Sequence, residues 1–232
     1  MNTLTVVLFD IDGTLLDLRG AGRHAFVQAI EAVFGWRDDI AYVNFAGNTD
    51  LNVLQQVLQA HGRPVTDEDC DRFFRRLPLE LEGAAAGAEL ILYPGVRELL
   101  ETLSARDDVV LGLVTGNIET CARIKLRQFN LHGHFVLGAF GDDHADRNEI
   151  ARLALDRIRA SLPRGATIRR VTLVGDTPLD VAAAKAIGAT CIAVATGKFN
   201  AAALRSAGAD HALDTLADTP NVLALLGLRS PH

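Results

Sequence analysis

Asp10 and Asp12 are separated by one residue, and together they could hold a cation or act on a reactive group. They follow the apolar residues 6–9 and lead into Gly13. A short apolar run that ends in a turn is typical of a strand buried on both faces of a parallel sheet, and ligands bind beyond the carboxyl ends of such strands. Two carboxylates this close repel each other unless a cation lies between them or one holds a proton. The alternative is an ordinary acidic turn, since Asp and Gly are common there.

Three further strand-like runs also end in small, polar or charged residues, and each is followed by a helical pattern. They are residues 109–114 before Thr115, Gly116 and Asn117; residues 170–175 before Asp176 and Asp180; and residues 135–140 before Asp142, Asp143 and Arg147. The carboxyl ends of parallel strands lie along one edge of a sheet. We therefore expect residues that are far apart in the sequence to converge on a single site.

These segments resemble the four motifs of the haloacid dehalogenase superfamily in type, order and approximate spacing. Residues 10–14 resemble the first motif, residues 115–117 the second and residues 175–180 the fourth. The third motif usually carries a lysine, whereas the candidate here is Arg147, which keeps the positive charge and can hold a phosphate with its planar fork. Arg147 could instead be a solvated helix residue, in which case Lys125 and Lys185 are the next candidate cations.

The resemblance implies an α/β fold with a doubly wound, Rossmann-like parallel sheet as its core and an inserted α-helical cap domain. We predict a core of residues 1–18 and 91–232 and a cap of residues 19–90, because the segment between the first two motifs lacks strand-like runs. Within the cap we expect helices at 24–34, 50–60 and 67–82, with Thr49 and Thr66 as N-caps. Core helices are expected at 96–103, 118–129, 148–160 and 179–187, and further strands at 190–195 and 212–213.

The resemblance also implies catalytic roles. Asp10 is the expected nucleophile, which attacks a phosphoryl group and becomes an aspartyl-phosphate. Asp12 is the expected general acid and base for the leaving oxygen and the attacking water. Thr115 would donate its hydroxyl to a phosphate oxygen, together with the amides of Gly116 and Asn117, although Thr115 could be only an N-cap. The expected role of Arg147 is to neutralise the transferred group.

An Mg²⁺ site is implied by the same motifs. Asp10, the main-chain carbonyl of Asp12 and Asp176 offer the oxygen ligands that this ion prefers. Asp180 either supports the metal or only caps a helix, because residues 177–180 are also a good helix start. Thr14, Asn48 and Thr49 are further candidates for phosphate or substrate binding; the last two lie where cap loops of the family often touch substrate.

Composition agrees with a compact enzyme of 232 residues, 49% of them hydrophobic. Its formal net charge of -6 and the absence of a dense Lys/Arg block argue against a nucleic-acid surface. Three scattered cysteines favour a reducing, cytoplasmic location, and no apolar stretch is long enough to predict membrane insertion. The sequence leaves the oligomeric state open.

We therefore predict a Mg²⁺-dependent phosphatase of the phosphoglycolate-phosphatase-like branch, which hydrolyses a small organic phosphomonoester. The alternatives are a phosphomutase, a dehalogenase, or a catalytically weak binding or regulatory homologue. Asp12 favours phosphate chemistry over dehalogenation, because a departing halide needs no proton and family members that displace halide generally lack this aspartate. The sequence does not identify the physiological substrate.

Overall fold

The computed structural model describes residues 3–229, so residues 1, 2 and 230–232 of the expected core lie outside the described part. Its main sheet has six strands in the order β5-β4-β1-β6-β7-β8, and every neighbouring pair is parallel. The strands are β1 (Thr3–Phe9), β4 (Val109–Val114), β5 (Leu137–Ala139), β6 (Thr167–Gly175), β7 (Thr190–Val194) and β8 (His211–Leu213). The prediction of an α/β fold with a parallel sheet is confirmed.

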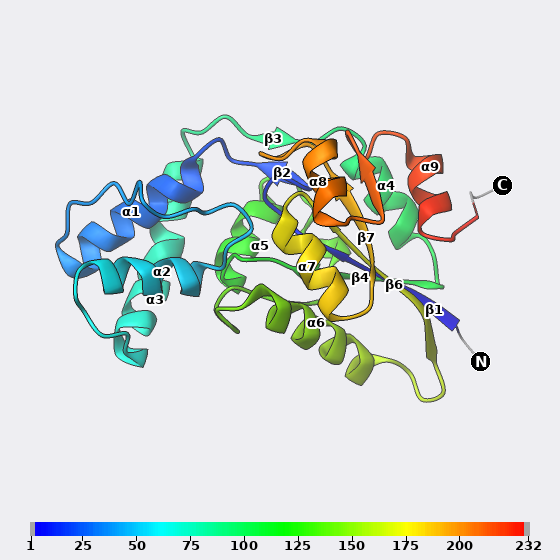
Figure 1. Ribbon diagram of the computed structural model, residues 1–232, viewed down its shortest axis with the longest axis horizontal. Helices are drawn as coiled ribbons and strands as arrows, with labels where there is room; N and C mark the ends of the chain where they lie inside the picture. Colours follow the sequence, from blue (N-terminus) through cyan, green and yellow to red (C-terminus); the bar gives the residue numbers. More distant parts are fainter. Residues whose placement is uncertain (1–2, 230–232) are drawn as a thin grey trace.

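Helices cover both faces of this sheet (Figure 1). One face carries α4 (Val96–Ser104), α5 (Glu119–Arg127) and α9 (Thr219–Leu225), and the other carries α6 (Arg147–Ser161), α7 (Pro178–Ala186) and α8 (Ala201–Ala207). Side chains of a strand point alternately to opposite faces. Accordingly, Val7 and Phe9 of β1 pack in one apolar cluster, whereas Val6 and Leu8 pack in the other. The sheet is therefore buried on both sides, as a doubly wound fold requires.

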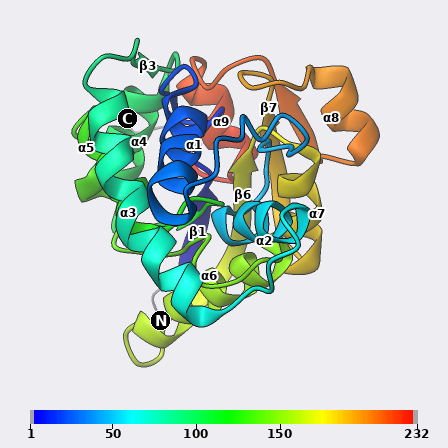
Figure 2. The same cartoon turned by 90° about the vertical axis from the view of Figure 1, so that its left-hand side faces the viewer.

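The chain leaves and re-enters the core through two short strands, β2 (Leu16–Asp17) and β3 (Ile91–Leu92), which pair antiparallel. Between them lie α1 (Ala21–Phe34), α2 (Asp50–Ala60) and α3 (Asp67–Ala85). Helix α1 packs along α3, and the rings of Phe26 and Phe73 are 4.6 Å apart between centroids. These three helices stand beyond the carboxyl ends of the main strands, as two views at right angles show (Figures 1 and 2).

The expected helix starts at Thr49 and Thr66 are confirmed, because each hydroxyl accepts a hydrogen bond from the main-chain amide three residues later. Several boundaries differ from the prediction: α1 begins earlier, at Ala21, and α3 continues to Ala85. The strand expected at 135–140 is only Leu137–Ala139, since it lies at the edge of the sheet and pairs with β4 alone. No helix between residues 3 and 229 combines the length and apolar character that crossing a bilayer requires.

Candidate active site

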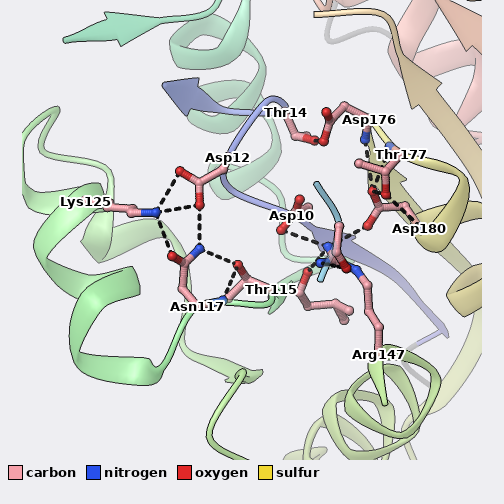
Figure 3. Close-up of polar contacts among 12 residues, drawn as sticks. Asp10, Asp12, Thr14, Thr115, Asn117, Lys125, Arg147, Asp176, Thr177 and Asp180 are labelled. Carbon is pink, nitrogen blue, oxygen red and sulfur yellow. Dashed lines mark hydrogen bonds and ion pairs between the residues drawn. The ribbon is translucent and has the colours of Figure 1, made fainter. Parts of the chain in front are cut away.

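The carboxyl ends of the central strands bring the polar residues of the motifs together (Figure 3). Phe9 at the end of β1 is in register with Leu113 of β4 and Val174 of β6, so Asp10, Thr115 and Asp176 follow at one edge. Carboxylate oxygens of Asp10, Asp176 and Asp180 lie within 4.8 Å of one another. The parallel register therefore assembles the cluster that the spacing of the motifs predicts.

Arg147 lies between two of these carboxylates. Its Nη2 atom is 2.9 Å from Asp10 Oδ1 and 2.6 Å from Asp180 Oδ1, and its guanidinium also donates to the main-chain carbonyls of Gly47 and Val114. Burial opposes its charge, but the two carboxylates outweigh this effect and raise the pKa of Arg147. The side chain is buried and not solvated, so the arginine stands at the centre of the cluster.

Three carboxyl groups share one guanidinium, which makes it unfavourable for all three to be ionised together. Burial, with the neighbouring Asp180 and Asp10 carboxylates, raises the pKa of Asp176 to about 9. Burial also raises the pKa of Asp10 to about 6, although Arg147 acts in the opposite direction. A hard divalent cation could take the place of the proton that these raised pKa values favour, because carboxylate oxygens are its preferred ligands.

The surroundings of Asp176 also fit a metal ion. Thr14 donates its hydroxyl to Asp176 Oδ1 at 3.3 Å, and a Cβ atom on Gly13 or Gly197 would overlap the same carboxylate. Asp180 Oδ1 contacts Arg147 but accepts no well-aligned hydrogen bond from the described residues. The three carboxylates could therefore hold a metal ion, and the two glycines leave room for the carboxylate of Asp176.

Asp180 both caps a helix and pairs with the arginine. Its Oδ2 atom accepts hydrogen bonds from the amide of Asp176 at 3.2 Å and from the amide and hydroxyl of Thr177 at 2.9 and 2.7 Å. These contacts complete a capping box at the start of α7. The other carboxylate oxygen faces Arg147. Asp180 thus fixes the positions of Asp176 and Arg147 whether or not it contacts a metal.

Asp12 lies apart from this cluster and is held by a second cation. Lys125 Nζ lies 2.8 and 2.6 Å from the two carboxylate oxygens of Asp12, and Asn117 Nδ2 donates to Oδ2 at 2.6 Å. Lys125 also donates to Asn117 Oδ1 at 2.6 Å, which closes a three-residue network. Burial opposes the charge of Lys125, but the Asp12 and Asp50 carboxylates outweigh it and raise its pKa.

Thr115 and the residues after it face the site from the end of β4. Thr115 Oγ1 accepts hydrogen bonds from the main-chain and side-chain nitrogens of Asn117 at 3.3 and 2.9 Å. The next amides, of Ile118 and Glu119, donate to carboxylates of Asp50 and Asp142. A Cβ atom on Gly116 would overlap the carbonyl of Asn48, so glycine allows the cap loop to approach here.

The site opens into a cavity of about 500 Å³ that is lined by residues of both the core and the inserted helices. Asn48 lies in its wall, together with Asp10, Asp12 and Arg147. Thr49 does not: its buried hydroxyl caps α2 and donates to the carbonyl of Ala145 at 2.8 Å. Thr14 also lies behind the wall. The structure therefore brings Asn48 to the cavity and assigns Thr49 and Thr14 supporting contacts.

Comparison of the sequence with known proteins shows which family this chain belongs to. The family model described as haloacid dehalogenase-like hydrolase matches residues 7–194. The chain belongs to this family. A probable phosphatase, IndB, of Dickeya dadantii is 29% identical over 231 residues, which cover 97% of this chain and 96% of the relative. A phosphoglycolate phosphatase of Pseudomonas putida is 29% identical over 203 residues, 83% of this chain and 70% of that protein.

Solved structures agree at the level of the fold. A hydrolase from Pseudomonas syringae superimposes with a TM-score of 0.70 at 24% identity, covering 98% of this chain and 100% of the other. The predicted resemblance to haloacid dehalogenase-like enzymes is thus confirmed, and the names of the relatives bear out the expected enzyme class, a phosphatase.

Lys125 has a role that the sequence pattern does not assign to it, because it pairs with Asp12 and does not replace Arg147. The sequence contains a signal for its burial, because Cys121, Ala122 and Lys125 recur at helical spacing on one face of α5 and all three are buried. A lysine on a buried face needs a carboxylate partner. The sequence alone did not show that this partner is Asp12.

Proposed function

We propose that this protein is a Mg²⁺-dependent phosphatase that hydrolyses a small organic phosphomonoester. The observation that carries the proposal is the placement of Asp10, which lies at the end of β1 in a cavity, contacts Arg147 and neighbours Asp176. Two relatives that are named a phosphatase or a probable phosphatase support it. The test is release of inorganic phosphate from p-nitrophenyl phosphate and a panel of small natural monoesters. Release with Mg²⁺ is expected, and silence across the panel would contradict the proposal.

In this proposal Asp10 is the nucleophile. One of its carboxylate oxygens attacks phosphorus, the ester P–O bond breaks, and an aspartyl-phosphate forms; water then attacks phosphorus and restores the carboxylate. Arg147 holds Asp10 in place and provides positive charge beside the transferred group. Thr115 and Gly116 line the same cavity, where the hydroxyl and the amide would act as further donors.

Asp10, Asp176 and the main-chain carbonyl of Asp12 would hold the Mg²⁺, with Asp180 in support. When bound, the ion supplies positive charge that offsets the carboxylates and the phosphate. Asp180 contributes through its hydrogen bond from the Asp176 amide, which fixes the direction of the neighbouring ligand. Glycine at 13 and 197 leaves the space that the Asp176 carboxylate occupies.

Asp12 is the proposed general acid and base. It would protonate the leaving oxygen in the first step and take a proton from water in the second. Lys125 and Asn117 hold its carboxylate at the cavity wall. A halide leaving group would need no such proton carrier, which is why we favour phosphate ester hydrolysis over dehalogenation.

We also propose the division into a core of residues 1–18 and 91–232 and a cap of residues 19–90. The antiparallel pair of β2 and β3 forms the two crossings between these parts. Cap residues Asn48 and Asp50 reach the cavity beside core residues. A cap in this place would exclude water while the acyl phosphate exists. The three unpaired cysteines are consistent with the cytoplasmic location that we propose.

Replacing Arg147 with alanine is expected to reduce both activity and stability. The change leaves Asp10 and Asp180 buried without their cation, and breaking a buried pair in this way costs roughly 3–5 kcal/mol. Denaturant unfolding and phosphatase assays measure the two effects. Arg147→Lys should recover part of each loss because it restores the charge. Wild-type stability and activity in Arg147→Ala would show that the cation role is wrong.

Lys125→Met is expected to change how the rate of hydrolysis depends on the leaving group of the substrate. The variant loses the cation that holds Asp12, so an alkyl phosphate, which needs a proton on its leaving oxygen, should slow by roughly 10–100-fold. A p-nitrophenyl ester should slow much less, because its phenolate leaves without protonation. Lys185→Met is the matched control, since Lys185 donates only to the carbonyl of Ala207 among the residues that the structure describes. Equal losses on both esters would indicate a purely structural lysine.

A further inference from the structure

The cavity extends well beyond the catalytic carboxylates. Its volume of about 500 Å³ is in the range of pockets that enclose drug-sized ligands. The part under the inserted helices is lined by apolar side chains, of which Phe45 is half-buried, while Phe26, Leu77 and Leu81 expose only 1%, 3% and 2% of their surface. The rings of Phe26 and Phe45 meet edge to face, with centroids 5.4 Å apart and planes at 88°. A two-carbon leaving group would fill only a small part of this volume.

Arg23 lines the same cavity, and no acidic partner for it is found in the described part of the chain. Its Nη2 atom donates to the main-chain carbonyls of Asp39 at 3.2 Å and Ile40 at 2.6 Å, and its guanidinium lies 5.0 Å from the centre of the Phe45 ring. These contacts fix the direction of the side chain. The two carbonyl oxygens accept from Nη2 and leave the positive charge of the guanidinium without a counterion.

The other cationic side chains of the cavity are either paired with a carboxylate or exposed to water. Arg147 and Lys125 are buried, and each pairs with a catalytic carboxylate. Arg19 and Lys198 are exposed to water. Arg23 is half-buried, and no carboxylate within residues 3–229 lies within ion-pair distance of it. A fixed, partly desolvated guanidinium beside an aromatic ring is a recognition site for an anion.

We propose that this cavity binds a phosphomonoester whose leaving group carries both a ring or other apolar segment and an anionic group. The apolar segment would pack against Phe45 at the apolar end of the cavity, and the anion would pair with Arg23. This inference rests on the proposed phosphatase function, because the catalytic residues lie in the same cavity. Either a carboxylate or a second phosphate could supply the negative charge that pairs with Arg23.

Four phosphate esters separate the requirement for an apolar segment from the requirement for an anion. Phosphoglycolate has the anion without the apolar segment, phenyl phosphate has the apolar segment without the anion, and p-carboxyphenyl phosphate and p-phenylene bisphosphate have both. The kcat/KM of wild type is expected to be higher for the last two esters than for phenyl phosphate by roughly 10–100-fold, the effect of a charge-assisted contact. Phosphoglycolate should be poorer than either. The better of the two doubly substituted esters identifies the preferred anion.

Arg23→Met tests the residue. In this variant the ratio of kcat/KM for p-carboxyphenyl phosphate to that for phenyl phosphate should fall to about one, mainly through KM, and Arg23→Lys should keep part of the preference. The ratio is measured on one protein sample, so partial loss of folded protein does not affect it. Arg72→Met is the matched control, because Arg72 also donates to a cap carbonyl, that of Val33, and lies outside the cavity.

The outcomes distinguish the two proposals. If wild type hydrolyses phenyl phosphate but shows no preference for the anionic aryl esters, or if Arg23→Met keeps the preference, the anion site is overturned and the phosphatase function stands. If phosphoglycolate is the best substrate, the apolar part of the proposal is wrong. If wild type with Mg²⁺ hydrolyses none of the four, both proposals fail.

Discussion

Asp10→Asn is expected to lower phosphatase turnover by roughly 10⁴-fold or more, because removing a nucleophile that forms a covalent intermediate has an effect of this order. The amide oxygen of asparagine is a poor nucleophile, while its size and shape match those of the carboxylate. The same change removes one of the two negative charges that Arg147 contacts. Acid quenching during turnover of a radiolabelled ester should show labelled wild-type protein and no label on the variant.

The Asp10→Asn protein is expected to stay folded, which makes the result interpretable. Asp180 still pairs with Arg147 in the variant, and the side-chain carbonyl oxygen of the introduced asparagine could accept a hydrogen bond from the same guanidinium. Thermal unfolding provides the control. A covalent phosphoryl label that persists in the folded variant would assign the nucleophile to another residue.

Asp12→Asn is expected to cause the second large loss of activity. Turnover of an alkyl phosphate should fall by roughly 10²–10⁴-fold, the usual contribution of a general acid and base. Mg²⁺ affinity should change less, because the main-chain carbonyl that we propose as the ligand remains. Steady-state rates and a metal titration of the folded variant measure the two quantities.

The network around Asp12 provides a further control. Lys125 acts through Asp12 in our account, so Lys125→Met should add little to the loss that Asp12→Asn already causes. Unchanged alkyl phosphate turnover in Asp12→Asn would exclude the role of proton carrier. Fully additive losses in the double variant would instead show that Lys125 affects catalysis by a separate route.

Several elements of the core and of the cap could be predicted because their signals are local. The apolar run at 109–114 is the full extent of β4, and α2 begins and ends where its threonine cap and apolar spacing indicate. Helices α8 and α9 were not predicted, since each has only seven residues and too few turns for a clear periodicity. The pair β2 and β3 was not predicted either, because two-residue strands have no pattern of their own.

The residues of the candidate site could be predicted from the order of the strand ends, but several of their side-chain contacts could not. Parallel strands place Asp10, Thr115 and Asp176 at one edge whatever the details of packing. The partner of Lys125 depends on how α5 lies against the first turn, and the environment of Arg23 depends on the fold of the cap. These contacts join residues that no local pattern connects, so only the three-dimensional structure reveals them.

The measurement that tests the central claim most directly is hydrolysis of p-nitrophenyl phosphate by wild type and Asp10→Asn, each with Mg²⁺ and with excess chelator. We predict activity only in wild type with Mg²⁺, because both the nucleophile and the charge that offsets the carboxylate cluster are then present. Equal activity of wild type with chelator, or of Asp10→Asn with Mg²⁺, would contradict a metal-dependent phosphatase that acts through Asp10.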